Sequence, residues 1–378
     1  MARRTTTAAH AALLLAVLAL PIVARAQLPR FTVTELPTLG GTSSFARGIS
    51  SNGLVTGNAQ TAAGMPAPRL NAYLFDGTSS ENLGVLPGSN NFSRGYAVNS
   101  SGVVVGESDN NAPRAFRWEN GVMTALPTLG GTTAVAHGIN DEGTIVGISS
   151  TGSASRATIW NGATVRDLGA SDNSTTTFSR AWSINERGDV VGFSRSTAGV
   201  SQATAWFAAG SPLALGSLGD GTRFSEAFAS NDAGIVVGRS NTGALTQGGT
   251  SVFSAFVWQG GTMSQLGSAG FTFSQANGIN SSGWIVGSAT NVSGAPSAAL
   301  LWNEGVASML ASFVDNADGW TFRSAEGIND AGQIVGFGTR NGVTRGFLLT
   351  PVPEPTSMLL FASGLLLLAG LSRKRRKN

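Results

Sequence analysis

Near the middle of the chain stands the ten-residue sequence Gly138-Ile139-Asn140-Asp141-Glu142-Gly143-Thr144-Ile145-Val146-Gly147. Asn140 and Gly143 are three residues apart, the spacing that favours a type I turn, and an Asn side chain can bond its own backbone two residues on. The pair Ile145-Val146 is β-branched and apolar, which predicts a short buried strand. The sequence therefore predicts two strands joined by a tight turn.

This repeat motif, small-Ile-Asn-x-x-Gly-x-Val-Val-Gly with local variation, occurs seven times. Its turn glycines are spaced by 49, 41, 45, 46, 49 and 49 residues and are Gly53, Gly102, Gly143, Gly188, Gly234, Gly283 and Gly332. A period of about 45 residues is typical of the blades of β-propellers. The repeat glycines are predicted to serve tight turns rather than a phosphate-binding loop, because the lysine that such a loop needs is absent from residues 27–351.

Three further motifs recur along the repeats. One resembles Ala115-Phe116-Arg117-Trp118, another is a Leu-Gly pair such as Leu168-Gly169, and the third resembles Phe178-Ser179-Arg180-Ala181. The first two predict additional strands, so that each repeat offers about four short strands. Tryptophans of the first motif share one position and are predicted to pack between blades, whereas Trp182, Trp284 and Trp320 lie elsewhere and are candidates for exposed contacts.

The ends of the repeat region predict how the ring closes. A lone strand at residues 31–36 precedes the first repeat, and residues 346–349 supply a strand that the last repeat lacks. Together they can complete one blade, which hides a sheet edge. We therefore predict an all-β, seven-bladed β-propeller of four-stranded blades, with a signal peptide before it and a hydrophobic helix after it. A β-solenoid is the alternative architecture.

Three segments are expected. Residues 1–26 have two early arginines, a short apolar run and an Ala-x-Ala cleavage pattern, which predicts a signal peptide handled by the Sec translocon and signal peptidase. Residues 27–351 form the propeller. Residues 352–378 form a tail that begins with Val352, Pro353, Glu354 and Pro355, continues with about fifteen apolar residues, and ends with Arg373, Lys374, Arg375, Arg376 and Lys377.

The tail resembles the PEP-CTERM sorting signal of Gram-negative bacteria. The resemblance covers Pro353-Glu354-Pro355, the hydrophobic helix that follows and the basic end, which favours the cytoplasmic side of a membrane. It implies an exported protein that is transiently anchored in the membrane, is processed by an exosortase and finishes in the cell envelope, at the surface or in the extracellular matrix. A plain C-terminal anchor is the alternative interpretation.

The recurring motifs resemble the extracellular HAF repeat family. That family combines Ala-Phe-x-Trp, Leu-Gly-x-Leu-Gly-Gly and Ile-Asn-x-x-Gly-x-Val-Val-Gly in the order found over nearly all of residues 31–350. Two places depart from it, at Asp167-Leu168-Gly169 and at Met309-Leu310, so individual strand lengths are open there. The resemblance implies an architecture and a surface location, but no chemistry.

Composition excludes several functions. The chain has 24 Lys and Arg against 21 Asp and Glu, but eight of the cations and one acid lie in the terminal segments. The remaining 16 cations and 20 acids make residues 27–351 net acidic, so nucleic acid is not an expected partner. The chain has no cysteine, and its two histidines are His10 and His137, so no zinc site is expected. We predict no catalytic residue, metal or cofactor.

One variable position precedes each repeat Asn by three residues, beside a position that stays small. A variable column of this kind suggests side chains that project from one rim or face as a contact surface, although simple tolerance of exposed positions is the alternative. Its members are Arg47, Tyr96, His137, Trp182, Phe228, Asn277 and Glu326.

These features together predict a non-enzymatic, exported propeller that serves as a binding or structural module, with exopolysaccharide or surface proteins as partners. The alternative is a secreted polysaccharide hydrolase or lyase that uses a pair of carboxylates from rim loops. Fold alone does not choose between them.

Overall fold

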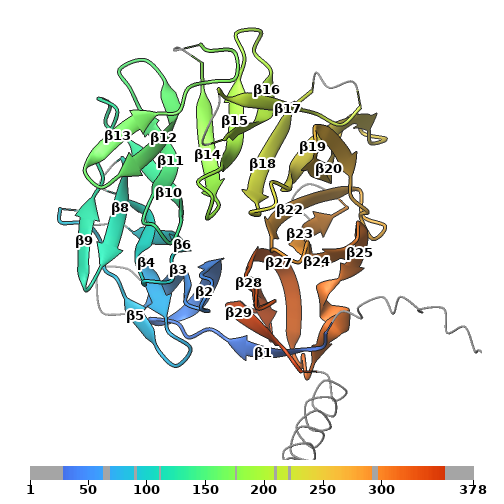
Figure 1. Ribbon diagram of the computed structural model, residues 1–378. Coiled ribbons are helices and arrows are strands. Elements are labelled where there is room, and N and C mark those ends of the chain that lie inside the picture. Colours follow the sequence, from blue (N-terminus) through green and yellow to red (C-terminus); the bar gives the residue numbers. More distant parts are fainter. Residues whose placement is uncertain are drawn as a thin grey trace, which may run out of the picture.

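The computed structural model describes residues 29–62, 69–88, 92–109, 112–174, 177–207, 211–219, 223–291 and 297–353. They form seven sheets arranged as a ring (Figure 1). The predicted all-β propeller of seven blades is confirmed, and β-solenoid architecture is excluded. The one helix in these ranges is the single 3-10 turn η1 (Leu310–Phe313). The expected signal peptide and C-terminal helix lie outside the described residues; inside them, no helix has the length and hydropathy that a membrane crossing requires.

Each blade has an inner, a second, a third and an outer strand, counted from the ring centre. The inner strands are β2 (Gly40–Ile49), β6 (Ser93–Val98), β10 (Ala134–Ile139), β14 (Ser179–Ile184), β18 (Ser225–Ser230), β22 (Phe273–Ile279) and β27 (Trp320–Ile328). The second strands are β3 (Val55–Thr61), β7 (Val104–Asp109), β11 (Ile145–Ser150), β15 (Val190–Arg195), β19 (Val236–Leu245), β23 (Ile285–Thr290) and β28 (Ile334–Arg340). The third strands are β4 (Leu70–Phe75), β8 (Pro113–Glu119), β12 (Ser155–Asn161), β16 (Ser201–Trp206), β20 (Ser251–Gln259), β24 (Ala298–Asn303) and β29 (Val343–Pro351). The outer strands are β5 (Ser80–Asn82), β9 (Val122–Ala125), β13 (Thr164–Asp167), β17 (Leu213–Gly216), β21 (Thr262–Gln265), β25 (Val306–Met309) and β1 (Phe31–Glu35).

The two ends of the chain complete the seventh blade, as the sequence predicts. Strand β1 pairs antiparallel with β29, from Phe31 opposite Pro351 to Glu35 opposite Phe347, and the two strands lie side by side in Figure 1. This blade departs from the expected four strands, because β26 (Val314–Asp315) adds a fifth by pairing parallel with β1. Strand β1 therefore has neighbours on both sides at Phe31 and Thr32, and its outer edge is uncovered only from Val33 to Glu35.

The repeat motif forms the predicted turn in every blade, between the inner and second strands. The N–H of each turn glycine donates to the carbonyl three residues earlier, at 2.9–3.1 Å, and these glycines have φ between 75° and 91°. The Asn Oδ1 accepts the N–H four residues on, for example from Asp189 to Asn185 at 2.8 Å. At Asn185 it also accepts the N–H two residues on that the sequence suggests, from Arg187 at 3.1 Å. The second strand is therefore fixed to the turn at its first residues. We call the side that carries these turns the turn face and the opposite side the loop face.

The same asparagines join the blades into a ring. Each is buried, and its Nδ2 donates to the backbone carbonyl at the equivalent position of the next blade, as Asn185 does to Asn231 at 3.0 Å. Six such bonds run from Asn99 round to Ser50, and Asn52 supplies the remaining link by donating to Ser100 at 2.9 Å. An amide side chain is needed here because it accepts within one blade while it donates to the next.

The Leu-Gly motif is a connection rather than the strand that the sequence predicts, because it follows the outer strand in most blades. It lies where consecutive blades meet. Ser225 of the next blade donates to the Gly216 carbonyl and accepts the N–H of Ala203 at 2.8 Å. Equivalent serine contacts occur at four other junctions, among them the one between the seventh and first blades, where Ser44 accepts from Gly346 at 3.0 Å.

The apolar core is divided among the junctions between blades. Seven clusters of buried side chains each combine residues from two consecutive blades. The repeated tryptophans pack there, as predicted: Trp160 and Trp302 have no exposed area, and their Nε1 atoms donate to the carbonyls of Pro127 and Gly267 of the preceding blade. Consecutive blades are therefore held together by buried apolar clusters between their sheets and by the ring of asparagine hydrogen bonds nearer the centre.

Candidate functional site

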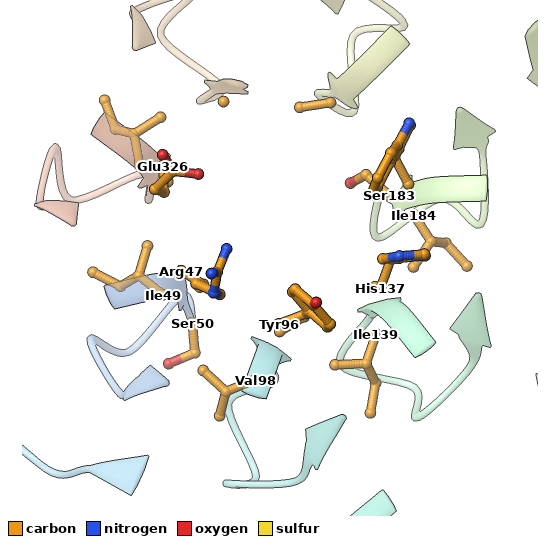
Figure 2. A pocket seen from close by; sticks show the side chains of 18 of the residues that line it. Arg47, Ile49, Ser50, Tyr96, Val98, His137, Ile139, Ser183, Ile184 and Glu326 are labelled. Atoms are coloured by element: carbon orange, nitrogen blue, oxygen red, sulfur yellow. The ribbon is translucent and has the colours of Figure 1, made fainter. Parts of the chain in front are cut away.

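Every inner strand contains a β-bulge at the variable position. Pairing with the second strand skips the residue at this position in each blade, and these residues are Arg47, Tyr96, His137, Trp182, Phe228, Asn277 and Glu326. A bulge inserts one residue into a strand and redirects its side chain. Here it directs all seven toward the axis of the ring, where they line a central cavity of about 290 Å³. Figure 2 shows Arg47, Tyr96, His137 and Glu326 pointing into it.

The glycine that ends each repeat motif makes the bulge possible. Gly238 pairs with Ala227, directly before the bulged Phe228. A Cβ on Gly238 would come closer than 3.0 Å to the Glu226 carbonyl oxygen, and the same holds for the other six equivalents. These glycines lie in a strand, so the prediction that the repeat glycines serve turns is right for the turn glycines, such as Gly143, and wrong for the glycine that ends the motif.

Four consecutive blades give the cavity an aromatic wall. Ring centroids are 5.4 Å apart for Tyr96 and His137, 4.4 Å for His137 and Trp182, and 6.0 Å for Trp182 and Phe228. The Arg47 guanidinium lies 5.4 Å from the centroid of the Tyr96 ring and begins the polar part of the lining. Rings at these distances form a continuous apolar surface that offers edges and faces to a ligand.

The other three blades give a polar wall. Asn277 donates to the Ala325 carbonyl at 2.9 Å, Arg47 Nε donates to Asn58 at 3.0 Å, and Ser324 donates to one oxygen of Glu326 at 2.5 Å. Within the described ranges, the terminal guanidinium nitrogens of Arg47 and the second oxygen of Glu326 have no hydrogen bond to protein. Burial raises the pKa of Glu326, and the Ser324 hydrogen bond and the charge of Arg47 act in the opposite direction.

Two carboxylates, Glu107 on β7 and Glu226 on β18, hold rings of the aromatic wall in place by hydrogen bonds. Glu107 accepts from the Tyr96 hydroxyl at 2.8 Å and from Arg94 at 2.8 Å. Glu226 accepts from Trp182 Nε1 at 2.8 Å, and its other oxygen accepts from Arg239 at 2.9 Å. Burial, with Glu107 adding to it, raises the pKa of Tyr96 to about 12. Sequence reasoning missed these positioning residues, because Trp182 and Glu226 are 44 positions apart and belong to different blades.

Among the four side chains of the aromatic wall, His137 is the one that can take up a proton. Burial lowers its pKa to about 3, and the charge of Arg180 adds to this effect, while the Ala181 carbonyl opposes it. Its Nδ1 is buried and has no partner among the described residues. His137 is therefore neutral near pH 7, and the aromatic wall carries no positive charge there.

The lowered pKa predicts a sign for the effect of acid on stability. Below its ordinary value of 6.5, the unfolded chain protonates His137 and the folded chain does not, so the free energy of unfolding falls as the pH drops toward 3. His137→Phe keeps a ring of similar size without the titration. We expect the wild type to lose more stability than this variant in urea denaturation between about pH 7.5 and about pH 4.5. Equal losses would contradict the assignment. Glu326 titrates in the opposite sense in both proteins, so their difference isolates His137.

Carboxylates also surround the cavity on the turn face, but each is engaged by backbone. Asp141 accepts the N–H of Ser100 at 2.7 Å, Glu186 that of Asp141 at 3.0 Å, and Asp232 that of Glu186 at 3.1 Å. Burial raises the pKa of Glu186. These side chains join the turns of consecutive blades, which gives the rim carboxylates a structural role.

The remaining candidates from the sequence fall in two places. Trp182 lies in the cavity, whereas Trp284 and Trp320 are partly buried and pack against the core between the sixth and seventh blades, so these two are not the exposed contacts that the sequence suggests. Val352 is 36% exposed and donates its N–H to the Arg30 carbonyl at 2.8 Å, which places Val352 and Pro353 directly after β29. Glu354, Pro355 and the basic residues 373–377 lie outside the described residues.

Comparison with known proteins adds one finding. Residues 351–376 match the family model of the PEP-CTERM protein-sorting motif. No curated protein matches the chain. The propeller thus ends at the residue where the matched segment begins, and that motif implies an exported protein that an exosortase processes in the envelope of a Gram-negative bacterium.

Proposed function

We propose that this chain is a HAF-repeat protein, sorted to the cell surface or exopolysaccharide matrix, whose propeller binds a saccharide in its central cavity without catalysing a reaction. The carrying observation is the cavity itself: seven bulges direct seven side chains to one point. A purely structural ring has no need for a different residue in each blade. The Sec translocon and signal peptidase would act on residues 1–26, and an exosortase on the tail.

The chemistry of the two walls supports a saccharide. Pyranose rings have apolar C–H faces that pack on aromatic rings, and Tyr96, His137 and Trp182 supply such rings side by side. Hydroxyl groups need both donors and acceptors, which the free nitrogens of Arg47 and the free oxygen of Glu326 supply on the opposite wall. A volume of about 290 Å³ is near the lower limit of small-molecule sites, which suits one or two sugar rings.

The hydrolase alternative has less support. A glycosidase uses two carboxyl groups, one on each side of the scissile bond. The wall of the cavity contributes Glu326, and the nearest acids at its turn-face end, Asp141 and Glu186, accept hydrogen bonds from backbone N–H groups. Acids that cap turns are poorly placed to move toward a substrate.

Binding to a panel of mono- and disaccharides, measured by calorimetry, tests the proposal. We expect Glu326→Gln to weaken binding of the best sugar by about tenfold, because an uncharged amide accepts a weaker hydrogen bond from a hydroxyl. Glu81→Gln is the matched control: it removes the same charge from an exposed residue of the outer strand β5 and should change nothing.

Two outcomes would contradict the proposal. Binding that is equal in wild type and Glu326→Gln would place the ligand elsewhere. Release of reducing ends during incubation with oligosaccharides, lost in Glu326→Gln, would favour the hydrolase instead.

A further inference from the structure

The loop face carries a second feature that the central cavity does not include. Phe178, Phe193, Phe224 and Phe253 form a row across the fourth and fifth blades, and we call it the phenylalanine row. Successive ring centroids are 5.5, 6.3 and 5.7 Å apart, and all four residues are partly exposed. Phe178 and Phe224 directly precede the inner strands β14 and β18, which run toward the turns, so the row lies at the opposite end of these blades.

Each end of the row opens into a cavity between two blades. One, of about 410 Å³, is lined by Phe178, Arg195 and serines of the adjacent hairpins. The other, of about 360 Å³, is lined by Phe253, Phe273 and Arg239. The rings and the two cavities therefore form an extended strip rather than an isolated pocket, and an extended strip suits a polymer chain better than a single sugar.

Arginines interleave with the rings. Arg239 lies 5.8 Å from the centroids of both Phe224 and Phe253, and Arg180 lies 5.6 Å from that of Phe178 and 4.7 Å from that of Trp182. Arg195 is exposed beside the first cavity. Guanidinium groups over aromatic faces keep their N–H groups available at the ring edges.

Arg180 differs from the other arginines at this level of the ring in having no carboxylate opposite it, since its partner position on β15 is Phe193. At the same level of the ring Arg94 pairs with Glu107 at 2.8 Å and Arg239 pairs with Glu226 at 2.9 Å. Arg180 makes no ion pair with any described residue, and its Nε is buried without a partner. The carboxylates that act on its charge, Glu226 and Glu107, are already paired with Arg239 and Arg94. A partly buried cation whose neighbouring acids are taken by other arginines is available to pair with an anion from outside.

The acids nearest this strip are already engaged. Glu226 accepts from Arg239 and Trp182, and Asp172 accepts the backbone N–H groups of Thr197 and Ser174 at 2.7 and 3.0 Å. Of the arginines at the strip, Arg239 is paired with Glu226, whereas Arg180 and Arg195 form no ion pair with a described residue. Although the propeller region as a whole is net acidic, this part of the loop face is locally positive.

The described ends of the propeller lie on the opposite face. Phe31 pairs with Pro351, and a Cβ on Gly332, in the repeat turn, would lie 3.2 Å from Pro351. Both ends of the propeller therefore emerge on the turn face. A tail that anchors the chain from Val352 onward would hold the turn face toward the membrane and the loop face away from it.

We propose that the phenylalanine row, with Arg180, Arg195 and Arg239, is a docking surface for a carboxylated polysaccharide chain. The rings pack against the apolar faces of successive sugars, and Arg180 pairs with a uronate carboxylate. This surface borders the saccharide cavity proposed above, since Arg180 lies over the Trp182 ring, and it goes beyond that cavity because it binds a polymer along its length.

Polygalacturonate and its methyl-esterified form provide matched probes, since they share a backbone and differ in charge. With purified protein we expect the ester to bind at least about tenfold more weakly than the acid, and binding of the acid to weaken as salt is raised. Arg180→Met should weaken binding of the acid by a similar factor without lowering Tm, because it removes an unpaired cation. Arg166→Met, on the exposed outer strand β13, is the control with the same charge change and should bind normally.

Phe253→Ser changes the end of the row that lies on the third strand β20, and it should also weaken binding of the polymer. Glu326→Gln, in the central cavity, should leave binding of the polymer unchanged. The result with Glu326→Gln distinguishes the two proposals, because this variant should weaken binding of the small saccharide in the central cavity and leave binding of the polymer intact. The proposal is overturned if the ester binds as well as the acid, if Arg180→Met binds as tightly as wild type, or if poly-L-glutamate binds more tightly than polygalacturonate.

Discussion

Gly238→Ala is expected to abolish the native propeller or to lower its free energy of unfolding by at least about 3 kcal/mol. The added Cβ would come closer than 3.0 Å to the Glu226 carbonyl oxygen and to the Phe256 ring. The oxygen belongs to the backbone of the inner strand β18, which is paired with β19 and packed between the neighbouring blades, so it cannot move away. The strand would have to lose its bulge, and Phe228 would leave the cavity. Urea denaturation followed by circular dichroism measures the loss.

Gly248→Ala in the same blade is the control for this prediction. Gly248 lies in the hairpin between β19 and β20, where the nearest atom to a new Cβ is Thr246 Oγ1 at 3.9 Å. We expect its free energy of unfolding to stay within about 0.5 kcal/mol of wild type. A Gly238→Ala protein as stable as this control would show that the bulge does not depend on close approach at Gly238.

The architecture could be predicted from the sequence because it rests on short-range rules that repeat. Asn140 and Gly143 define a turn by their spacing alone, and Ile145-Val146 defines the strand that follows. Seven copies set the number of blades. The strands at the two ends can be predicted because one precedes the first repeat and the other supplies the strand that the last repeat lacks. Their register confirms that they pair.

The candidate site was only partly predictable. A variable column that contains His137 and Glu326 shows that the position is not part of the core, but not in which direction it points. Strand alternation gives direction, and a bulge shifts that alternation by one residue. In the sequence, the one sign of this shift is the glycine two positions into the next strand, such as Gly147 or Gly336. Sequence patterns alone assign glycine there to a turn.

Side chains that act between blades could not be found from the sequence. Glu107 and Glu226 hold Tyr96 and Trp182, but the first is supplied by a neighbouring strand and the second by the next blade. Their columns are mixed, because each blade meets a different pair of neighbours at this level. The lack of a partner for Arg180 is likewise a property of the assembled ring, since it depends on where every nearby acid has its hydrogen bonds.

Deletion of residues 27–36 is expected to prevent the ring from closing, although it removes no repeat motif. Phe31 and Leu36 have no exposed area, and burial of such side chains stabilises a fold by about 1.5–3 kcal/mol each. Loss of β1 also leaves one edge of β29 unpaired along five residues, from Phe347 to Pro351. Against a total stability of about 5–15 kcal/mol these losses are large, and the exposed edge of β29 promotes aggregation. Size-exclusion chromatography and thermal unfolding measure both effects.

A circular permutant distinguishes the need for β1 from the need for a particular chain end. Because Phe31 lies opposite Pro351, a short turn can join the end of β29 to the start of β1, with new ends after Leu36. This chain keeps every strand and converts the closing pair into a hairpin, so we expect it to be monomeric and at least as stable as the unpermuted propeller. If the truncated chain stayed monomeric with the Tm of the intact one, closure by the two ends would not be what holds the seventh blade. If instead the permutant restores what the truncation loses, the ring is stabilised by the pairing itself, and the order in which the chain supplies the strands is immaterial to the folded state.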